Sequence, residues 1–252
     1  MIEVKNIDKS FDGNRVLKNV SAVFEAGKTN MIIGQSGSGK TVLMKSIIGL
    51  HRIDQGRIEY DGRNLPDMRM SDIRILRREV GMLFQGSALF DSLSVLENVM
   101  YPLDMFSPAP KEEIVERARF CLHHVNLEEK AFKLAPSEIS GGMQKRVAIA
   151  RAIALQPKYL FCDEPNSGLD PKTSLIIDRL IHDITVEFNI TTIINSHDMN
   201  SVMEIGENII FINKGEKAWQ GTKDDIFHVD NEDLNDFVFA SELYKKEKKA
   251  NS

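Results

Sequence analysis

Cysteine is scarce in this sequence, and long apolar runs are missing from it. The 252 residues include two cysteines, Cys121 and Cys162, which lie far apart and form no Cys-x-x-Cys pair. That spacing argues against a disulfide framework and against a zinc site, and it fits a reducing compartment. No apolar stretch approaches the roughly 20 residues that span a bilayer, and the polar start has no signal-peptide core. If the protein works at a membrane, we expect another chain to supply the spanning part.

An excess of positive charge is also missing. The formal net charge is −5, from 32 Lys and Arg against 37 Asp and Glu, so no global basic field favours nucleic acid. The hydrophobic fraction of 42% and charged fraction of 27% are those of an ordinary globular protein. In the lysine-rich tail, glutamate is interleaved with the lysines, which favours a solvated end over a lipid-binding one. We therefore expect one domain over residues 1–245 and a flexible tail over 246–252.

Short apolar stretches of strand type alternate with helical patterns along the chain. This alternation predicts an α/β fold with a mostly parallel sheet, into which a helical lobe is inserted. Turn residues at Asp12-Gly13-Asn14 and Ala26-Gly27-Lys28 interrupt the first strands. The expected strands cover parts of 2–32, 56–65, Val80–Phe84, Tyr159–Cys162, Thr191–Ile194 and a hairpin over 209–219, and the expected helices cover 41–50, most of 92–153 and 172–188.

A glycine-rich run lies between an apolar strand, 30–33, and a helix. Its sequence is Gly34-Gln35-Ser36-Gly37-Ser38-Gly39-Lys40-Thr41, followed by Val42, and it has the Walker A spacing. The glycines let successive backbone N–H groups point at one anion, and the helix adds its positive N-terminal end. Lys40 would reach the β- and γ-phosphates, and the Thr41 hydroxyl would ligate Mg²⁺. The alternative is a glycine-rich turn with a chance lysine; the flanking strand and helix favour nucleotide binding.

Two adjacent acids follow the apolar strand Tyr159–Cys162. Asp163 comes at the carboxyl end of that strand, where open α/β sheets bind their ligands, and is expected to hold Mg²⁺. Glu164 comes next and is expected to act as general base on the attacking water. The alternative is a solvated acid pair in a turn, which is disfavoured by Pro165 and by the distinctive run 166–170 that follows.

A third motif resembles that of a known family. Ile139-Ser140-Gly141-Gly142-Met143 is similar to the LSGGQ signature of the ATP-binding cassette (ABC) ATPases, and the resemblance covers nearly the whole chain. Taken alone, Ser140-Gly141-Gly142 at a helix start is either an anion seat or an ordinary N-cap. The resemblance implies a P-loop ABC ATPase core with a mostly parallel sheet, an N-terminal antiparallel β-subdomain and an inserted helical subdomain over about 86–153.

The resemblance also assigns roles to single residues. It implies that Phe11 stacks on adenine, although a core aromatic is the alternative, and that Gln85 touches Mg²⁺ and water. Asp170 ends the D-loop run, and His197 corresponds to the switch histidine near the γ-phosphate. The chain departs from the family pattern at Phe11, Ile139, Met143 and Gly168, which we expect to alter rates and not chemistry. We expect three residues to be catalytic: Glu164, His197 and Gln85. The expected metal ligands are Thr41, Gln85 and Asp163. The residues expected to bind ATP are Phe11, Gly34, Gln35, Ser36, Gly37, Ser38, Gly39, Lys40, Thr41, Val42, Ser140, Gly141, Gly142 and Asp170.

The partners follow from the family arrangement. In these ATPases the signature of one subunit completes the Walker A site of another, which implies a head-to-tail homodimer with two ATP molecules. In three places the sequence resembles the ATPases of bacterial lipid-asymmetry transporters of the Mla type. These are Phe84–Val99, the residues that follow the glycine-rich run from Val42, and Met143. We therefore expect an ATPase that drives phospholipid trafficking from the cytoplasmic face of the inner membrane, with a multi-spanning permease and a periplasmic MCE-domain (mammalian cell entry) protein.

Alternatives remain for the cargo and for the class of protein. Amino-acid import and lipoprotein export are the other transport functions. DNA repair ATPases of the family carry coiled-coil or zinc insertions, and ribosomal members carry two cassettes, neither of which is found in this sequence. A regulatory protein without turnover is disfavoured by Glu164 and His197. The cargo and the direction of transport depend on the membrane and periplasmic chains.

Overall fold

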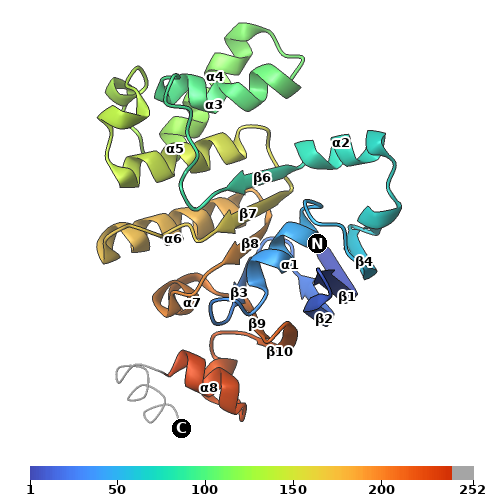
Figure 1. Cartoon of the computed structure of the whole chain (residues 1–252). Helices are drawn as coiled ribbons and strands as arrows, with labels where there is room; N and C mark the ends of the chain where they lie inside the picture. Colours follow the sequence, from blue (N-terminus) through green and yellow to red (C-terminus); the bar gives the residue numbers. More distant parts are fainter. Residues whose placement is uncertain (240–252) are drawn as a thin grey trace. The chain divides into compact units, whose positions relative to one another are not determined.

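The computed structural model describes residues 1–239, and their contacts divide the chain into two compact units (Figure 1). Among the described residues, the first unit consists of Met1–Met70 and 191–239. The second unit is Ser71–Ile190, which includes the predicted helical stretch 86–153. The predicted flexible tail, 246–252, lies outside the described residues.

An antiparallel sheet forms one half of the first unit. Its strand order is β2-β1-β4-β5, with β1 and β2 paired from Ile2 opposite Phe24 to Phe11 opposite Asn14. The turn between them lies at Asp12 and Gly13, whose φ angles are 49° and 81°, in the region that suits a tight hairpin. This confirms the predicted break at 12–14. The strands are β1 (Ile2–Phe11), β2 (Asn14–Phe24), β4 (Gln55–Tyr60) and β5 (Arg63–Asn64).

A second group of strands in this unit carries the glycine-rich run. The central strand β3 is fully buried and pairs in parallel with β8 and with β9, and β10 extends β9 as an antiparallel hairpin. Its last three residues, Met31–Ile33, are buried and apolar, which is typical of parallel strands covered on both faces. The predicted helix 41–50 is α1, which ends earlier, at Ile47, because Gly49 takes a φ of 82°. The elements are β3 (Thr29–Ile33), α1 (Lys40–Ile47), η1 (Leu65–Asp67), β8 (Thr191–Asn195), α7 (Met199–Ile205), β9 (Asn208–Asn213), β10 (Glu216–Gly221), η4 (Asp225–Phe227) and α8 (Glu232–Val238).

The second unit combines a parallel strand pair with a helical lobe. Strand β6 pairs with β7 so that Leu83 lies opposite Cys162, and α3, α4 and α5 pack against one another, as the green helices of Figure 1 show. Ser94 begins α3 with a capping box, since its side chain and that of Glu97 satisfy each other's backbone N–H groups. Strand β6 ends at Leu83, one residue before the predicted strand Val80–Phe84, and the Phe84 side chain is 45% exposed. The elements are α2 (Met70–Arg78), β6 (Val80–Leu83), α3 (Val95–Phe106), α4 (Lys111–His124), η2 (Glu129–Ala131), η3 (Pro136–Glu138), α5 (Gly141–Ile153), β7 (Tyr159–Asp163) and α6 (Pro171–Glu187).

Both cysteines are buried free thiols. Cys121 lies in α4 and Cys162 in β7, and neither forms a disulfide. Burial raises the pKa of the Cys121 thiol to about 11 and raises that of Cys162 further. In residues 1–239 no helix is both long enough and apolar enough to cross a membrane.

Candidate functional site

The glycine-rich loop has a backbone that only glycine allows at key positions. Gly34, Gly37 and Gly39 have φ angles of 147°, 78° and 110°. A Cβ on Gly34 would overlap the carbonyl oxygen of Ile212, and one on Gly39 would lie 3.2 Å from the carbonyl oxygen of Val16. Because this neighbouring backbone lies so close, Gly34 and Gly39 leave no room for a side chain. Helix α1 starts directly after Gly39, which adds the positive end of its dipole.

Two buried polar groups lie inside this loop. The Lys40 side chain is only 7% exposed, and its Nζ donates to the carbonyl oxygens of Gly34 at 2.7 Å and Gln35 at 3.0 Å. Ser38 is 6% exposed, and its Oγ has no hydrogen-bond partner among the described residues. A buried hydroxyl of this kind is costly unless an acceptor or donor reaches it. A buried ammonium and a buried, unpartnered hydroxyl at the start of a helix fit a phosphate.

The remaining predicted residues of this loop face solvent or begin α1. Gln35, Ser36, Gly37 and Thr41 are exposed, and Val42 is half-buried. Exposure leaves the Thr41 hydroxyl accessible to a cation that a bound nucleotide would bring.

The end of β8 lies beside the glycine-rich loop in the same unit. In the parallel pair of β3 and β8, Ile32 lies opposite Asn195, and the Asn195 Nδ2 donates to Thr41 Oγ1 at 3.2 Å. His197 follows two residues later and is exposed, just before Asp198 caps α7. Asn195 was not identified as a site residue from the sequence. A polar residue at the end of an apolar strand could have indicated it. The first unit therefore brings Thr41, Asn195 and the strand end that carries His197 to one edge of the sheet.

In the second unit, the acids and Gln85 follow neighbouring strands. Asp163 is the last residue of β7, and Glu164 has a φ of 49°, which is uncommon outside glycine and frequent at functional sites. The Ser167 N–H donates to the Glu164 carbonyl at 3.1 Å and closes the turn. Gln85 leaves the sheet at the same edge after β6, and its Nε2 donates to Ser167 Oγ at 3.2 Å. Gln85 thus contacts the turn that the two acids begin.

The predicted metal ligands have a chemistry that suits Mg²⁺. Thr41 belongs to the first unit, and Gln85 and Asp163 belong to the second. Within residues 1–239, no three or more His, Cys, Asp and Glu side chains form a metal-binding group. Mg²⁺ commonly takes one or two protein oxygens and completes its shell with phosphate and water. A carboxylate, a hydroxyl and an amide oxygen are each of the oxygen type that Mg²⁺ binds, so each residue taken by itself is a fitting ligand.

The signature segment begins α5. Ser140 is its N-cap, and the Ser140 Oγ accepts from the Met143 N–H at 3.3 Å, so the ordinary N-cap interaction is present. Gly141 has open space, since a Cβ there would come no closer than 3.9 Å to Leu169. A Cβ on Gly142 would lie 2.7 Å from Thr173 Cγ2. Gly142 is therefore required by packing inside this unit, whereas Gly141 is not.

Asp170 serves as the N-cap of α6. Its carboxylate accepts from the Lys172 and Thr173 N–H groups at 3.1 Å each and from the Thr173 hydroxyl at 2.5 Å. These bonds, the Thr173 hydroxyl first, hold the pKa of the Asp170 carboxyl below its usual value. Among residues 1–239 the contacts of Asp170 are thus those of a helix cap, and its part in nucleotide binding stays a prediction.

Phe11 ends β1 with a partly exposed ring. Its side chain is 38% exposed, with the His51 ring edge-on at 5.2 Å and the Lys9 Nζ 5.0 Å from its centroid. A partly exposed ring can accept a stacked base, and the exposure disfavours the core-aromatic alternative.

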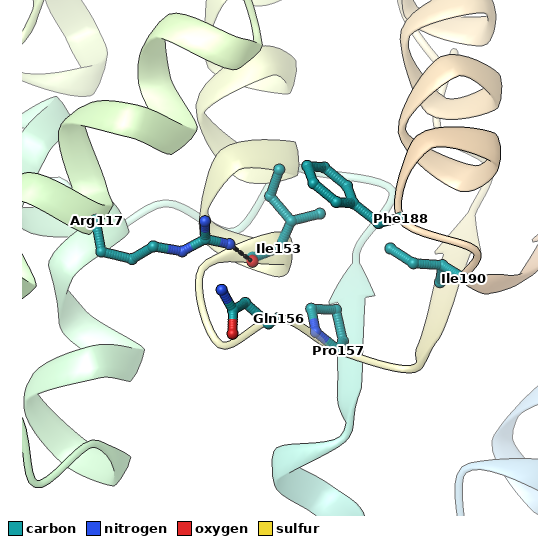
Figure 2. Close-up of a pocket in the computed structure, with 6 residues that line it drawn as sticks. All are labelled: Arg117, Ile153, Gln156, Pro157, Phe188 and Ile190. Atoms are coloured by element: carbon teal, nitrogen blue, oxygen red, sulfur yellow. Dashed lines mark hydrogen bonds between the residues drawn. The ribbon is translucent and has the colours of Figure 1, made fainter.

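A pocket of about 160 Å³ in the second unit lies apart from all predicted site residues. Figure 2 shows its lining, which is mainly apolar and includes Ile153, Phe188 and Ile190. Its one cation, Arg117, donates from Nε to the Ala154 carbonyl and from Nη2 to the Ile153 carbonyl, at 3.0 Å each. Arg117 therefore acts on the last carbonyls of α5, as cations at helix C-termini often do.

Comparison with known proteins identifies the family. The family described as ABC transporter matches residues 17–167, a range that contains the glycine-rich loop, Gln85, the signature segment and both acids. The chain is 40% identical over 227 residues to the methionine import ATP-binding protein MetN of Clostridium acetobutylicum, covering 90% of this chain and 70% of that protein. It is 41% identical over 221 residues to the glutamine transport ATP-binding protein GlnQ of Escherichia coli, covering 88% and 91%. A dimeric post-hydrolysis structure of the ATP-binding cassette MJ0796 with ADP and Pi aligns with a TM-score of 0.78 at 33% identity, covering 88% of this chain and 98% of that one. With its α/β fold and these matches, the chain belongs to the ABC transporter family.

Proposed function

We propose that this chain is the ATPase of an amino-acid importer. As a member of its family it is an ATPase coupled to transport. The observation that supports ATP binding is the glycine-rich loop, in which Lys40 and Ser38 are buried at the N-terminus of α1. For the cargo, the support comes from the two curated relatives, which are named for methionine and glutamine. These names favour the amino-acid alternative over phospholipid trafficking, and they give no support to an MCE-domain partner.

In this proposal each predicted site residue has a role in binding or hydrolysing ATP. Lys40, Ser38 and the loop N–H groups hold the β- and γ-phosphates, and Phe11 stacks on the adenine. Thr41, Asp163 and Gln85 would hold Mg²⁺, whose positive charge neutralises the phosphate oxygens. Glu164 accepts a proton from the attacking water, and His197 stabilises the γ-phosphate region from the end of β8.

A second copy would complete each site. The exposed Ser140 and Gly141 and the positive end of α5 form a surface suited to the outer face of a bound γ-phosphate. The dimeric state of the MJ0796 cassette with ADP and Pi supports this arrangement. ATP would then favour the closed homodimer, and hydrolysis would remove the contacts that hold it closed. Membrane contact would come through a permease subunit at the cytoplasmic face of the inner membrane.

Transport in proteoliposomes tests the proposal. The tagged chain is purified from native membranes with the multi-spanning protein that accompanies it, and the complex is reconstituted with ATP on the side of the ATPase. We expect ATP-dependent uptake of radiolabelled methionine or glutamine, and loss of that uptake in the complex that carries Glu164→Gln.

Two outcomes would count against the proposal. ATP-dependent transfer of labelled phospholipid without amino-acid uptake would restore the lipid alternative. ATP hydrolysis by the wild type that is unaffected by Glu164→Gln would remove the assigned base and leave the cargo assignment to be judged by uptake alone.

A further inference from the structure

Lys145 is a buried cation on α5 that contacts the Gln85 loop. Its side chain is 4% exposed, and its Nζ donates to the main-chain carbonyl oxygen of Gln85. Burial lowers the pKa of the Lys145 ammonium, while the Cys162 thiol of β7 acts on it in the opposite sense. The amine therefore links α5 directly to the Gln85 loop.

The loop after Gln85 has a shape that depends on such contacts. Ser87 and Ala88 have φ angles of 60° and 48°, and two consecutive non-glycine residues in the left-handed region are disfavoured. Arg151, six residues further along α5, donates from Nη2 to the Ser87 carbonyl and from Nη1 to the Ala88 carbonyl, at 2.7 Å each. Three carbonyl oxygens of one loop are thus bound by two cations of one helix, which offsets the backbone strain.

Helix α5 is itself fixed at its C-terminal end. Arg117 of α4 binds the carbonyls of Ile153 and Ala154, and Figure 2 shows the first of these bonds. The Arg117 contact therefore holds the C-terminal end of α5 against α4, while the signature segment forms the start of the same helix. A group held by the middle of this helix takes its position from the helix.

We propose that Lys145 is a positioning residue for Gln85. By holding the Gln85 carbonyl, Lys145 sets the direction in which the Gln85 side chain leaves the loop, toward the Ser167 hydroxyl. The position of Gln85 is in this way linked to the helix that begins with the signature segment, and Arg151 holds the carbonyls of Ser87 and Ala88 in the same loop. The catalytic consequence rests on the proposed function, in which Gln85 touches Mg²⁺ and water; the structural consequence does not.

A pair of neighbouring lysine and arginine substitutions tests this role in the full-length chain. Lys145→Met keeps an unbranched side chain that is one atom shorter, and it removes the amine donors. Arg146→Met is the matched control, because Arg146 Nη1 donates to the Asn126 carbonyl at 2.8 Å, from the same helix but to a different segment. Both variants lose one charge-assisted bond to a backbone carbonyl, and only Lys145→Met touches the Gln85 loop.

Hydrogen exchange of the peptide over residues 84–90 is the first measurement. Loss of one charge-assisted bond corresponds to about 10- to 100-fold more frequent local opening, so exchange of this peptide should speed up by that factor in Lys145→Met and stay unchanged in Arg146→Met. Steady-state ATPase is the second. We expect Lys145→Met to lower kcat about tenfold and to raise the Mg²⁺ concentration at half-maximal rate, with the Kd for Mg²⁺-free ATP within about twofold of wild type.

The outcomes separate the two proposals. Wild-type exchange at 84–90 in Lys145→Met, or equal acceleration in both variants, overturns the positioning role. Accelerated exchange with an unchanged kcat and Mg²⁺ dependence overturns its catalytic part. If Lys145→Met does not fold, Lys145→Gln, which keeps an N–H donor, is expected to give intermediate exchange and kcat, and wild-type values for both would overturn the role. A wild-type chain without ATPase activity would refute the proposed function, while the exchange data would still decide the role of Lys145.

Discussion

Replacing Ser38 by alanine should stabilise the nucleotide-free protein and weaken nucleotide binding at the same time. The Ser38 Oγ is buried and has no hydrogen-bond partner in residues 1–239. A buried unpartnered hydroxyl costs at least about 1 kcal/mol, so its removal should raise the thermal midpoint by about 2–4 °C in a domain of this size. If the hydroxyl donates to a phosphate in the complex, Ser38→Ala loses a bond to a charged group and binds ATP about 10- to 150-fold more weakly.

Ser46 provides a matched control in α1. Ser46 is fully buried, and its Oγ likewise has no partner among the described residues. It lies near the C-terminal end of α1, the helix that follows the glycine-rich loop. Ser46→Ala should therefore raise the midpoint by a similar amount and leave the Kd for ATP unchanged. Scanning fluorimetry without nucleotide gives the midpoints, and calorimetric titration with ATP gives the Kd.

The opposite behaviour of the two serines is the critical result. A lower midpoint for Ser38→Ala would mean that its hydroxyl already has a partner in the nucleotide-free protein. A wild-type Kd for Ser38→Ala would mean that the hydroxyl makes no bond to phosphate, and equal loss of affinity in Ser46→Ala would mean that the effect comes through α1 and not through the loop.

Three further predictions concern other parts of the chain. Glu164→Gln should bind ATP, lower kcat at least about 100-fold and elute as a dimer with ATP in size-exclusion chromatography; monomer with normal turnover would refute the base assignment. Asn98 is fully buried and hydrogen-bonds to both the N–H and the carbonyl of Phe90. Asn98→Leu should therefore lower the free energy of unfolding by about 3 kcal/mol and the thermal midpoint by roughly 6–12 °C. An unchanged midpoint would contradict this prediction. Burial raises the pKa of the Cys121 thiol from 9.0 to about 11. Between these two pH values only the unfolded chain loses the thiol proton, so the free energy of unfolding falls as the pH rises. This fall should be shallower in Cys121→Ala, and equal slopes in the two proteins would contradict the assignment.

Local sequence features predicted the elements that carry the nucleotide loop and the acids. The run 34–41 between strand and helix, the strand before Asp163 and the turn at Asp12-Gly13 were found because each depends on residues close in sequence. The short helices α7 and α8 were missed, since seven residues rarely form a helix without tertiary packing.

Contacts between distant residues could not be predicted from the pattern. Lys145 and Gln85 are 60 positions apart, and Asn195 and Thr41 are 154 apart, so no local period connects them. Asp170 shows the converse: the motif identified the residue, but its hydrogen bonds to Thr173 and Lys172 describe a helix cap that family resemblance alone did not include.

The two signature glycines should differ in how they tolerate mutation. Gly141 has room for a side chain, whereas a Cβ on Gly142 meets the Thr173 methyl group within the same chain. A substitution at Gly142 would therefore displace the start of α5 or α6 even in an isolated subunit, and a loss of activity there would not by itself report on contact with a second copy. Gly141 is the position at which a bulky label or a crosslinker would probe the dimer without first disturbing the subunit that carries it.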